Sequence, residues 1–133
     1  MLDALNKPAP FVIRSNALKT SREELIDKLQ AEGINATALD ETSNGILCDG
    51  GNILATEAYR NGLFTVQSLS SIMAIEAFAP ESGSRVLDMC AAPGGKTTAI
   101  AEAMGDSGKI VACDVYEHRL ALIEAAAKRL GIK

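Results

Sequence analysis

The stretch VLDMCAAPGGKTTAIAEAM, residues 86–104, decides the fold of the second half of the chain. An apolar run ends at Asp88, small residues and a proline follow, and two glycines precede a threonine- and alanine-rich segment. This order predicts a strand over 85–90, a tight turn, and a helix over 97–105. A small-residue turn in front of the free N–H groups of a helix suits an anionic or nucleoside-containing ligand.

The strand–turn–helix pattern continues downstream. KIVACDV predicts a strand over 109–115, and EHRLALIEAAAKRLG predicts a helix over 117–131. Strands that alternate with helices form a parallel sheet with right-handed crossovers. A helix over 68–80 precedes the first strand, and its spacing favours a buried apolar face made of Leu69, Ile72, Met73, Ile75 and Phe78.

The first half of the chain predicts a different order of elements. Ser21 and Glu24 form a capping box at the start of its first helix, and Asn44-Gly45 supplies a turn between its second and third strands. The order β-α-β-β-α-β is the ferredoxin-like, split βαβ pattern. Its strands are expected over 10–16, 34–40, 45–50 and 63–67, and its helices over 19–33 and 52–62.

Two acidic residues mark the carboxyl ends of the predicted parallel strands. Asp88 ends the first strand, and Asp114 ends the second, 19 residues after Gly95. Open parallel sheets bind ligands at this edge, and an acid at this distance commonly accepts hydrogen bonds from a ribose diol. Each aspartate alone could simply cap its own turn or helix. Together they favour a nucleoside-containing cofactor at the turn.

The segment GGKTT, residues 94–98, invites comparison with a phosphate-binding P-loop. That motif needs a glycine where Cys90 stands, and Pro93 lacks the N–H group that would cradle a phosphate. The dinucleotide motif G-x-G-x-x-G is absent from the sequence. A methyl-donor site therefore ranks above both, and an NTPase is the disfavoured alternative.

The composition of the chain limits where in the cell the protein works and what it binds. The net charge is −4, no apolar stretch is long enough to cross a membrane, and the N-terminus lacks a signal region. The odd number of cysteines, without metal-type spacing, predicts reduced thiols in a cytoplasmic protein with no metal and no membrane contact. Cys48 is expected to be inert, Cys90 and Cys113 to pack at the strand ends, and His118 to have no chemical role.

With these residues described, VLDMCAAPGGKTT closely resembles the first cofactor motif of the NOL1/NOP2/Sun RNA (cytosine-5)-methyltransferases, most of all the bacterial 16S rRNA members. The likeness extends through GLFTVQSLSS, FVIRSNALKTSREELIDKLQAEGI and the segment after residue 108. It implies an α/β fold in two parts. Residues 68–133 form a partial Rossmann-like, S-adenosylmethionine-dependent methyltransferase domain, and residues 1–67 form a small α+β, RNA-recognition-like (ferredoxin-like) subdomain.

The same resemblance assigns roles to the turn. Asp88 orients the loop, Asp114 takes the ribose hydroxyls of S-adenosyl-L-methionine, and Arg119 steadies that region. The methionine and ribose end is surrounded by Cys90, Ala91, Ala92, Pro93, Gly94, Gly95 and Lys96. The family usually has acidic residues where Ser68 and Leu69 follow the Val-Gln pair, so contacts with the substrate or at the domain junction are expected to be weaker here.

The family's two catalytic cysteines lie in later motifs, and this chain ends at Lys133. We therefore expect an N-terminal fragment of an enzyme with part of the cofactor site and no catalytic residue; Cys90 belongs to the cofactor loop. The alternative is a non-catalytic module that binds RNA or another partner. Two parallel strands with open edges predict self-association, strand exchange between chains, or marginal stability of the C-terminal half. RNA, as rRNA, is the implied partner. Basic residues of the first half form a candidate contact surface, among them Lys7, Arg14, Lys19, Arg22 and Lys28, but acidic residues interleave with them, so an ordinary solvated surface is an equally good interpretation.

Overall fold

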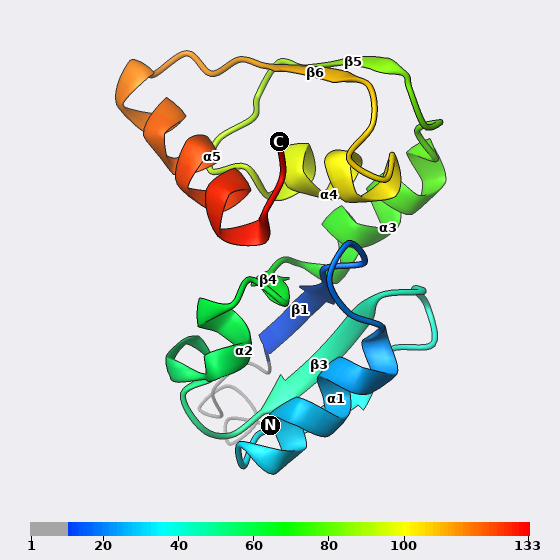
Figure 1. Ribbon diagram of the computed structural model, residues 1–133, viewed down its shortest axis with the longest axis vertical. Coiled ribbons are helices and arrows are strands. Elements are labelled where there is room, and N and C mark those ends of the chain that lie inside the picture. Colours follow the sequence, from blue (N-terminus) through cyan, green and yellow to red (C-terminus); the bar gives the residue numbers. More distant parts are fainter. Residues whose placement is uncertain (1–10) are drawn as a thin grey trace, which may run out of the picture.

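Two β-sheets organise residues 11–133, the part of the chain that the computed structural model describes (Figure 1). The first sheet is antiparallel, with the order β2-β3-β1-β4. This is the strand order expected of the ferredoxin-like pattern, so that prediction is confirmed. Its strands are β1 (Phe11–Ser15), β2 (Asn35–Ala38), β3 (Gly45–Asp49) and β4 (Phe64–Val66).

The two helical segments of this half differ in length. Helix α1 (Arg22–Ala31) begins at Ser21 with the predicted capping box, in which Ser21 and Glu24 each satisfy the other's backbone N–H. The predicted helix over 52–62 is broken instead. Thr56 has an extended backbone, so a 3-10 turn at Ile53–Ala55 ends there and α2 (Glu57–Arg60) begins.

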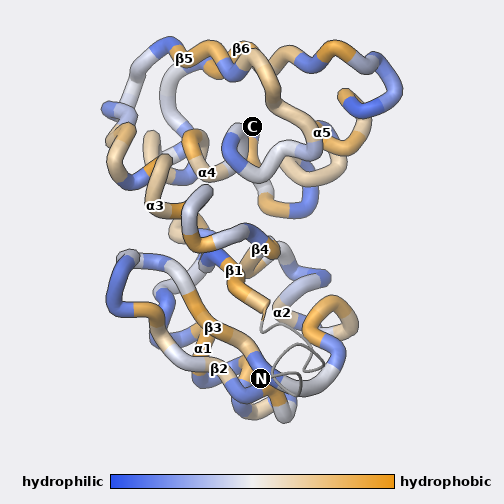
Figure 2. The backbone as a smooth tube through the Cα atoms, turned by 180° about the vertical axis from the view of Figure 1, so that it is seen from behind, coloured by the Kyte–Doolittle hydropathy of each residue, from blue (hydrophilic) through white to orange (hydrophobic). Residues whose placement is uncertain are grey.

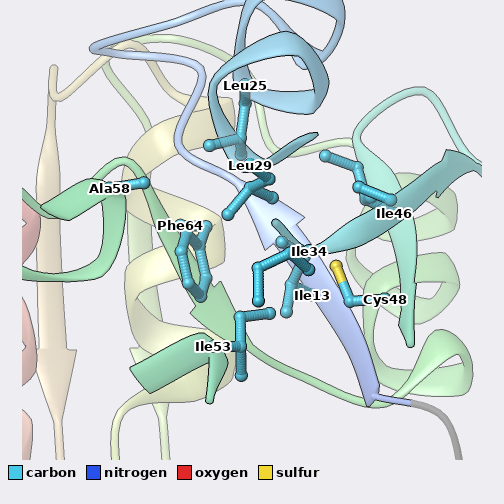
Figure 3. Close-up of a cluster of buried hydrophobic side chains, with 10 residues drawn as sticks. Ile13, Leu25, Leu29, Ile34, Ile46, Cys48, Ile53, Ala58 and Phe64 are labelled. Atoms are coloured by element: carbon cyan, nitrogen blue, oxygen red, sulfur yellow. The ribbon is translucent and has the colours of Figure 1, made fainter. Parts of the chain in front are cut away.

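The core of the first half lies between the helices and one face of the sheet (Figure 3). Ile13 and Ile46 from the strands meet Leu25 and Leu29 from α1, and Phe64 closes the cluster; all five are fully buried. Figure 2 shows the apolar residues of β1 and β3 at the centre of this half. Burial of each such side chain contributes roughly 1.5–3 kcal/mol, which is enough to fix the register of the sheet.

The second half contains the predicted parallel unit. Strand β5 (Arg85–Asp88) pairs with β6 (Lys109–Ala112) in parallel, with Leu87 opposite Val111. Both strands are shorter than predicted, because the chain turns after Asp88 and Ala112 into loops that bind each other through Cys113. The helices of this half are α3 (Leu69–Phe78), α4 (Gly95–Ala103) and α5 (Glu117–Leu130).

Helix α4 lies between the two sheets, as Figure 1 shows. Ile100 and Met104 on one side of it pack against Val86 and Ile110 of β5 and β6. A second stripe of the same helix faces β1 and carries Glu102. Because both sides are covered, every residue from Thr97 to Glu102 is buried, which suits the small side chains of this helix.

The contact between α4 and β1 is centred on Arg14, which is 2% exposed. Its guanidinium forms a two-pronged ion pair with Glu102, with N–O distances of 3.0 and 2.7 Å. It also donates to Thr98 Oγ1 at 3.1 Å, to the carbonyl of Gly95 at 2.9 Å, and to Gln67 Oε1. Burial raises the pKa of the Glu102 carboxyl, and Arg14 opposes that rise.

A second group of contacts joins the end of α5 to the first half. Asn16 donates to the carbonyl of Leu130 at 2.8 Å, and Lys19 donates to that of Arg129 at 3.1 Å. Arg129 in turn donates to the carbonyl of Phe64 at 2.9 Å. The bonds from Asn16 and Lys19 satisfy carbonyl groups that a helix end leaves without partners. Polar contacts at both α4 and α5 therefore hold the two halves of the chain together.

These contacts correct the predicted RNA surface. Arg14 is enclosed in protein and cannot reach a phosphate, so its predicted role is wrong. Lys19 is tied to the end of α5, and Arg22 donates to two backbone carbonyls between β2 and β3. Lys28 is exposed, and Lys7 lies outside the described residues. The position of Arg14 in a strand gave no sign that the outer face of the sheet would be covered.

The predicted buried face of α3 is also only partly correct. Ile72 and Ile75 are buried, but Met73 and Phe78 are 44% and 55% exposed. The outer face of the β5–β6 sheet is uncovered as well, with Leu87 58% and Val111 45% exposed. Among residues 11–133, no third strand pairs with either edge of this sheet.

We expect Arg14→Met to lower the free energy of unfolding by roughly 3–5 kcal/mol, because it leaves Glu102 buried without a counter-charge. The deficit should shrink between pH 7 and pH 5, since a raised pKa lets folded Glu102 take up a proton while the unfolded chain stays ionised. Urea unfolding at both pH values measures this. Glu23→Gln, which breaks an exposed pair with Arg22, is the control and should cost under about 0.5 kcal/mol.

We propose that the open face and edges of the β5–β6 sheet bind a second copy of the chain, because unpaired strand edges offer free N–H and C=O groups. Light scattering on a sizing column should show dimers at micromolar concentration. Leu87→Lys should return the chain to monomers, whereas Leu54→Lys, at an exposed apolar residue of the first half, should not. A wild-type monomer at 100 μM would refute the proposal.

Candidate functional site

The turn between β5 and α4 is held at both ends by Asp88. One carboxylate oxygen accepts a hydrogen bond from the N–H of Cys90 at 3.2 Å. The other accepts from the hydroxyl of Thr97 at 2.6 Å. Asp88 thus joins the start of the loop to the first turn of α4, an arrangement that fixes where the free N–H groups of the helix lie.

Asp114, at the end of the neighbouring strand, binds the middle of the same loop. Its carboxylate accepts from the N–H of Ala92 at 3.1 Å and from the N–H of Tyr116 at 3.1 Å. Arg119 reaches Asp114 at 3.4 Å and donates to the carbonyl of Ala92 at 3.1 Å. The bond from Tyr116, then those from Ala92 and Arg119, lower the pKa of Asp114, so the side chain is an anion with lone pairs still free.

Gly94 is required at the start of α4 for two reasons. Its φ of 104° lies in the left-handed region, which side chains rarely adopt. A Cβ there would lie 3.2 Å from the Cα of Ile123 and 3.4 Å from the Cβ of Ala126. Because Gly94 has no side chain, it cannot cap α4, and the first N–H groups of the helix are left for a ligand.

Two hollows flank the loop. The one beside Asp114 has a volume of about 230 Å³ and is lined by Met89, Cys90, Ala92, Asp114, Val115, Tyr116 and Arg119. The other has a volume of about 200 Å³ and is lined by Val66, Gln67, Ser71, Cys90, Ala91, Ala92, Pro93, Gly95 and Lys96. Since Cys90 and Ala92 border both, a single extended ligand could lie across the loop.

The structure therefore brings all ten predicted site residues to one edge of the sheet, around one loop. The sequence interpretation gave no role to Thr97, although it binds Asp88, nor to Gln67, which lines the second hollow. Thr97 could have been found as a hydroxyl in the first turn of a helix that follows a strand-end acid. Nothing in the local sequence points to Gln67.

The cysteines differ from one another. Cys48 is buried in the first core, and burial raises the pKa of its thiol to about 11. Cys90 and Cys113 are exposed, so the prediction that they pack at the strand ends is wrong. Both follow strands that end sooner than expected, and the loops carry them out to the surface. His118 is exposed, and its ring lies 5.7 Å from that of Tyr116.

Among residues 11–133, no group of three or more histidine, cysteine or acidic side chains is placed to hold a metal ion. None of the helices in that range combines the length and the apolar character needed to cross a membrane.

Known protein families match both the segment that contains the loop and the segment that contains most of the first sheet. A family model described as 16S rRNA methyltransferase RsmB/F matches residues 75–133. A second, described as the RsmF/B-like ferredoxin-like domain, matches residues 1–52. The chain is thus similar to the RsmB/F methyltransferases in both of its halves. The predicted family resemblance is thereby confirmed.

Individual curated proteins are similar to nearly all of the chain. The "Probable ribosomal RNA small subunit methyltransferase B" of Bacillus subtilis (strain 168) is 38% identical over 94% of the chain. The "26S rRNA (cytosine-C(5))-methyltransferase nsun-1" of Caenorhabditis elegans is 40% identical over 98%. The chain spans only 28% and 20% of these relatives.

A solved structure shares the fold of the chain. NSun6 from Pyrococcus horikoshii, crystallised with SFG, superposes with a TM-score of 0.89 at 22% identity. The match covers 99% of this chain and 58% of that one. The antiparallel sheet followed by a parallel β5–β6 unit is therefore an arrangement that a solved protein also adopts.

We expect two of the three thiols to react rapidly with Ellman's reagent at pH 8, because Cys90 and Cys113 are exposed. Cys48 should react only when the protein unfolds, since its pKa of about 11 leaves roughly a thousandth of it as thiolate. Cys48→Ala should leave the rapid count at two. Three rapid thiols in the folded wild-type protein would contradict the burial of Cys48.

Proposed function

We propose that the chain is part of an S-adenosylmethionine-dependent RNA (cytosine-5) methyltransferase that acts on rRNA in the cytoplasm. The observation that carries the proposal is the pair Asp88 and Asp114, which bind the same glycine loop from adjacent parallel strands. The names of the B. subtilis and C. elegans relatives support rRNA as the substrate and cytosine C5 as the methylated atom. The odd number of cysteines favours a reducing compartment.

The residues of the loop fit an adenosine-containing methyl donor. Asp114 is an ionised acceptor beside a hollow of about 230 Å³, which suits the hydroxyl groups of a ribose. Lys96 and the first turn of α4 lie beside the hollow on the other side of the loop, which suits an anionic group. Gly94 and Gly95 keep side chains out of the space between. When bound, S-adenosylmethionine would supply an electrophilic methyl group.

The described residues hold the loop in place and orient the bound ligand. None of them is assigned a part in making or breaking bonds. Asp88 and Thr97 fix the loop, Asp114 accepts from the ligand, and Arg119 keeps Asp114 in place. Cys90 belongs to the loop itself, where it borders both hollows, so we assign it to cofactor contact and not to attack on the base. RNA contact is proposed for exposed cations, of which Lys28 and Lys96 are examples.

Calorimetric titration with S-adenosylmethionine tests the cofactor assignment. We expect saturable binding that Asp114→Asn weakens at least about tenfold, because a charged acceptor is lost. Asp27→Asn, on the exposed side of α1, is the matched control and should bind as the wild type does. Circular dichroism shows whether each variant is folded.

Two results would overturn the assignment. Binding of ATP with magnesium in place of S-adenosylmethionine would make the loop a phosphate site. RNA binding by a folded chain that takes neither small molecule would favour the non-catalytic RNA-binding module.

A further inference from the structure

Gln67 is a buried amide that lacks half of its hydrogen-bond partners. The residue, which follows β4, is 8% exposed, and its Oε1 accepts from Arg14. Its Nε2 is shielded from solvent and has no acceptor among the residues that the structure describes. Leaving a buried donor without an acceptor is costly, so such a group in a hollow points to a ligand.

The orientation of this amide is set by Arg14. A guanidinium can only donate, so the oxygen of Gln67 must face Arg14 and the NH2 group must face away from it. Arg14 cannot turn aside, because Glu102 holds two of its nitrogens. The reverse orientation, with Nε2 against the guanidinium, would set donor against donor. The amide is thus fixed with its donor on the side of the loop.

The donor of Gln67 lies at the start of α4. A Cβ placed on Gly95 would be 3.7 Å from Nε2, so the amide group lies beside the first turn of the helix. Gln67 also lines the hollow of about 200 Å³ that contains Lys96, Ser71 and the loop from Cys90 to Pro93. The helix end and Lys96 are both positive, and Nε2 adds a further donor.

We propose that Gln67 Nε2 donates a hydrogen bond to an oxyanion of the ligand bound at this loop. The inference rests on the proposed function for the identity of the ligand. An oxyanion fits better than a hydroxyl or a neutral carbonyl, because the helix start, the ammonium group of Lys96 and the amide all favour negative charge. Its source is either the carboxylate of the methyl donor or a phosphate of the RNA.

The binding site then includes a residue outside the glycine loop. Gln67 lies between the ferredoxin-like sheet and α3, and Arg14 of β1 orients it. Strand β1 of the ferredoxin-like half would therefore contribute to the affinity of the loop through Arg14, which orients Gln67 without itself touching the ligand. We class Gln67 as a binding residue and Arg14 as a positioning residue.

Gln67→Glu is the decisive variant, because it keeps an oxygen for Arg14 and replaces the donor by a second oxygen. The ion pair with Arg14 should preserve the fold, while the new charge repels an oxyanion. Gln30→Glu makes the same change of charge on exposed α1 and is the matched control. Arg129→Met loosens the α5 contact without touching Gln67, and controls for weakening of the junction alone.

Two ligands that differ only by a carboxylate separate the possible sources. We would titrate the chain with S-adenosylmethionine, decarboxylated S-adenosylmethionine, inorganic phosphate and a short RNA, following the side-chain amide signals of Gln67 by NMR. These signals are assigned by their absence in Gln67→Glu. We expect S-adenosylmethionine to shift them and to bind Gln67→Glu at least about tenfold more weakly, with Gln30→Glu and Arg129→Met within about twofold of wild type.

Each outcome decides the matter. A shift with S-adenosylmethionine but not with its decarboxylated form assigns the carboxylate; a shift with phosphate and RNA alone assigns the phosphate. If phosphate shifts Gln67 and S-adenosylmethionine does not bind, the inference survives and the proposed cofactor fails. If S-adenosylmethionine binds the loop with equal affinity in Gln67→Glu, and no oxyanion shifts the Gln67 amide, the inference is wrong while the proposed function stands. No response to any of the four refutes the oxyanion.

Discussion

Arg14 carries a positive charge in a place that water does not reach, and the arrangement of the two halves follows from that fact. A buried guanidinium is tolerated only when its donors are matched, and here Glu102, Thr98, Gln67 and the carbonyl of Gly95 match them. Three of these partners belong to α4 and one to the segment after β4. A different placement of the halves would separate the guanidinium from several of them at once.

Helix α4 connects Arg14 to the glycine loop, so the position of the loop depends on the contacts of Arg14. Its first residue accepts from Arg14, its hydroxyl at Thr97 binds Asp88, and its apolar side supports β5 and β6. The helix that follows the glycine loop is thus packed against both sheets. The loop is short and its bonds to Asp88 and Asp114 are local, but the position of the helix depends on the ferredoxin-like half.

The sequence predicted the features that depend on neighbours along the chain. The strand–turn–helix unit, the capping box at Ser21 and the spacing of Asp88 and Asp114 all arise from local patterns, and the structure contains each of them. The partner of Arg14 lies 88 residues away, so its charge was assigned to the surface. For the same reason, no local sequence pattern pointed to Gln67, whose partner Arg14 is also far away along the chain. The exposure of Cys90 depended on where β5 ends, which is the least certain feature of a strand pattern.

The capping of α5 has a consequence for how the protein folds. The carbonyl of Leu130 is satisfied by Asn16, 114 residues earlier, and that of Arg129 by Lys19. The last two carbonyl groups of α5 therefore gain these partners only when the segment after β1 is in place. Contacts between such distant residues slow folding, because a long loop must close before they form. The two halves, each with a core of its own, are in this way tied together at the end of α5.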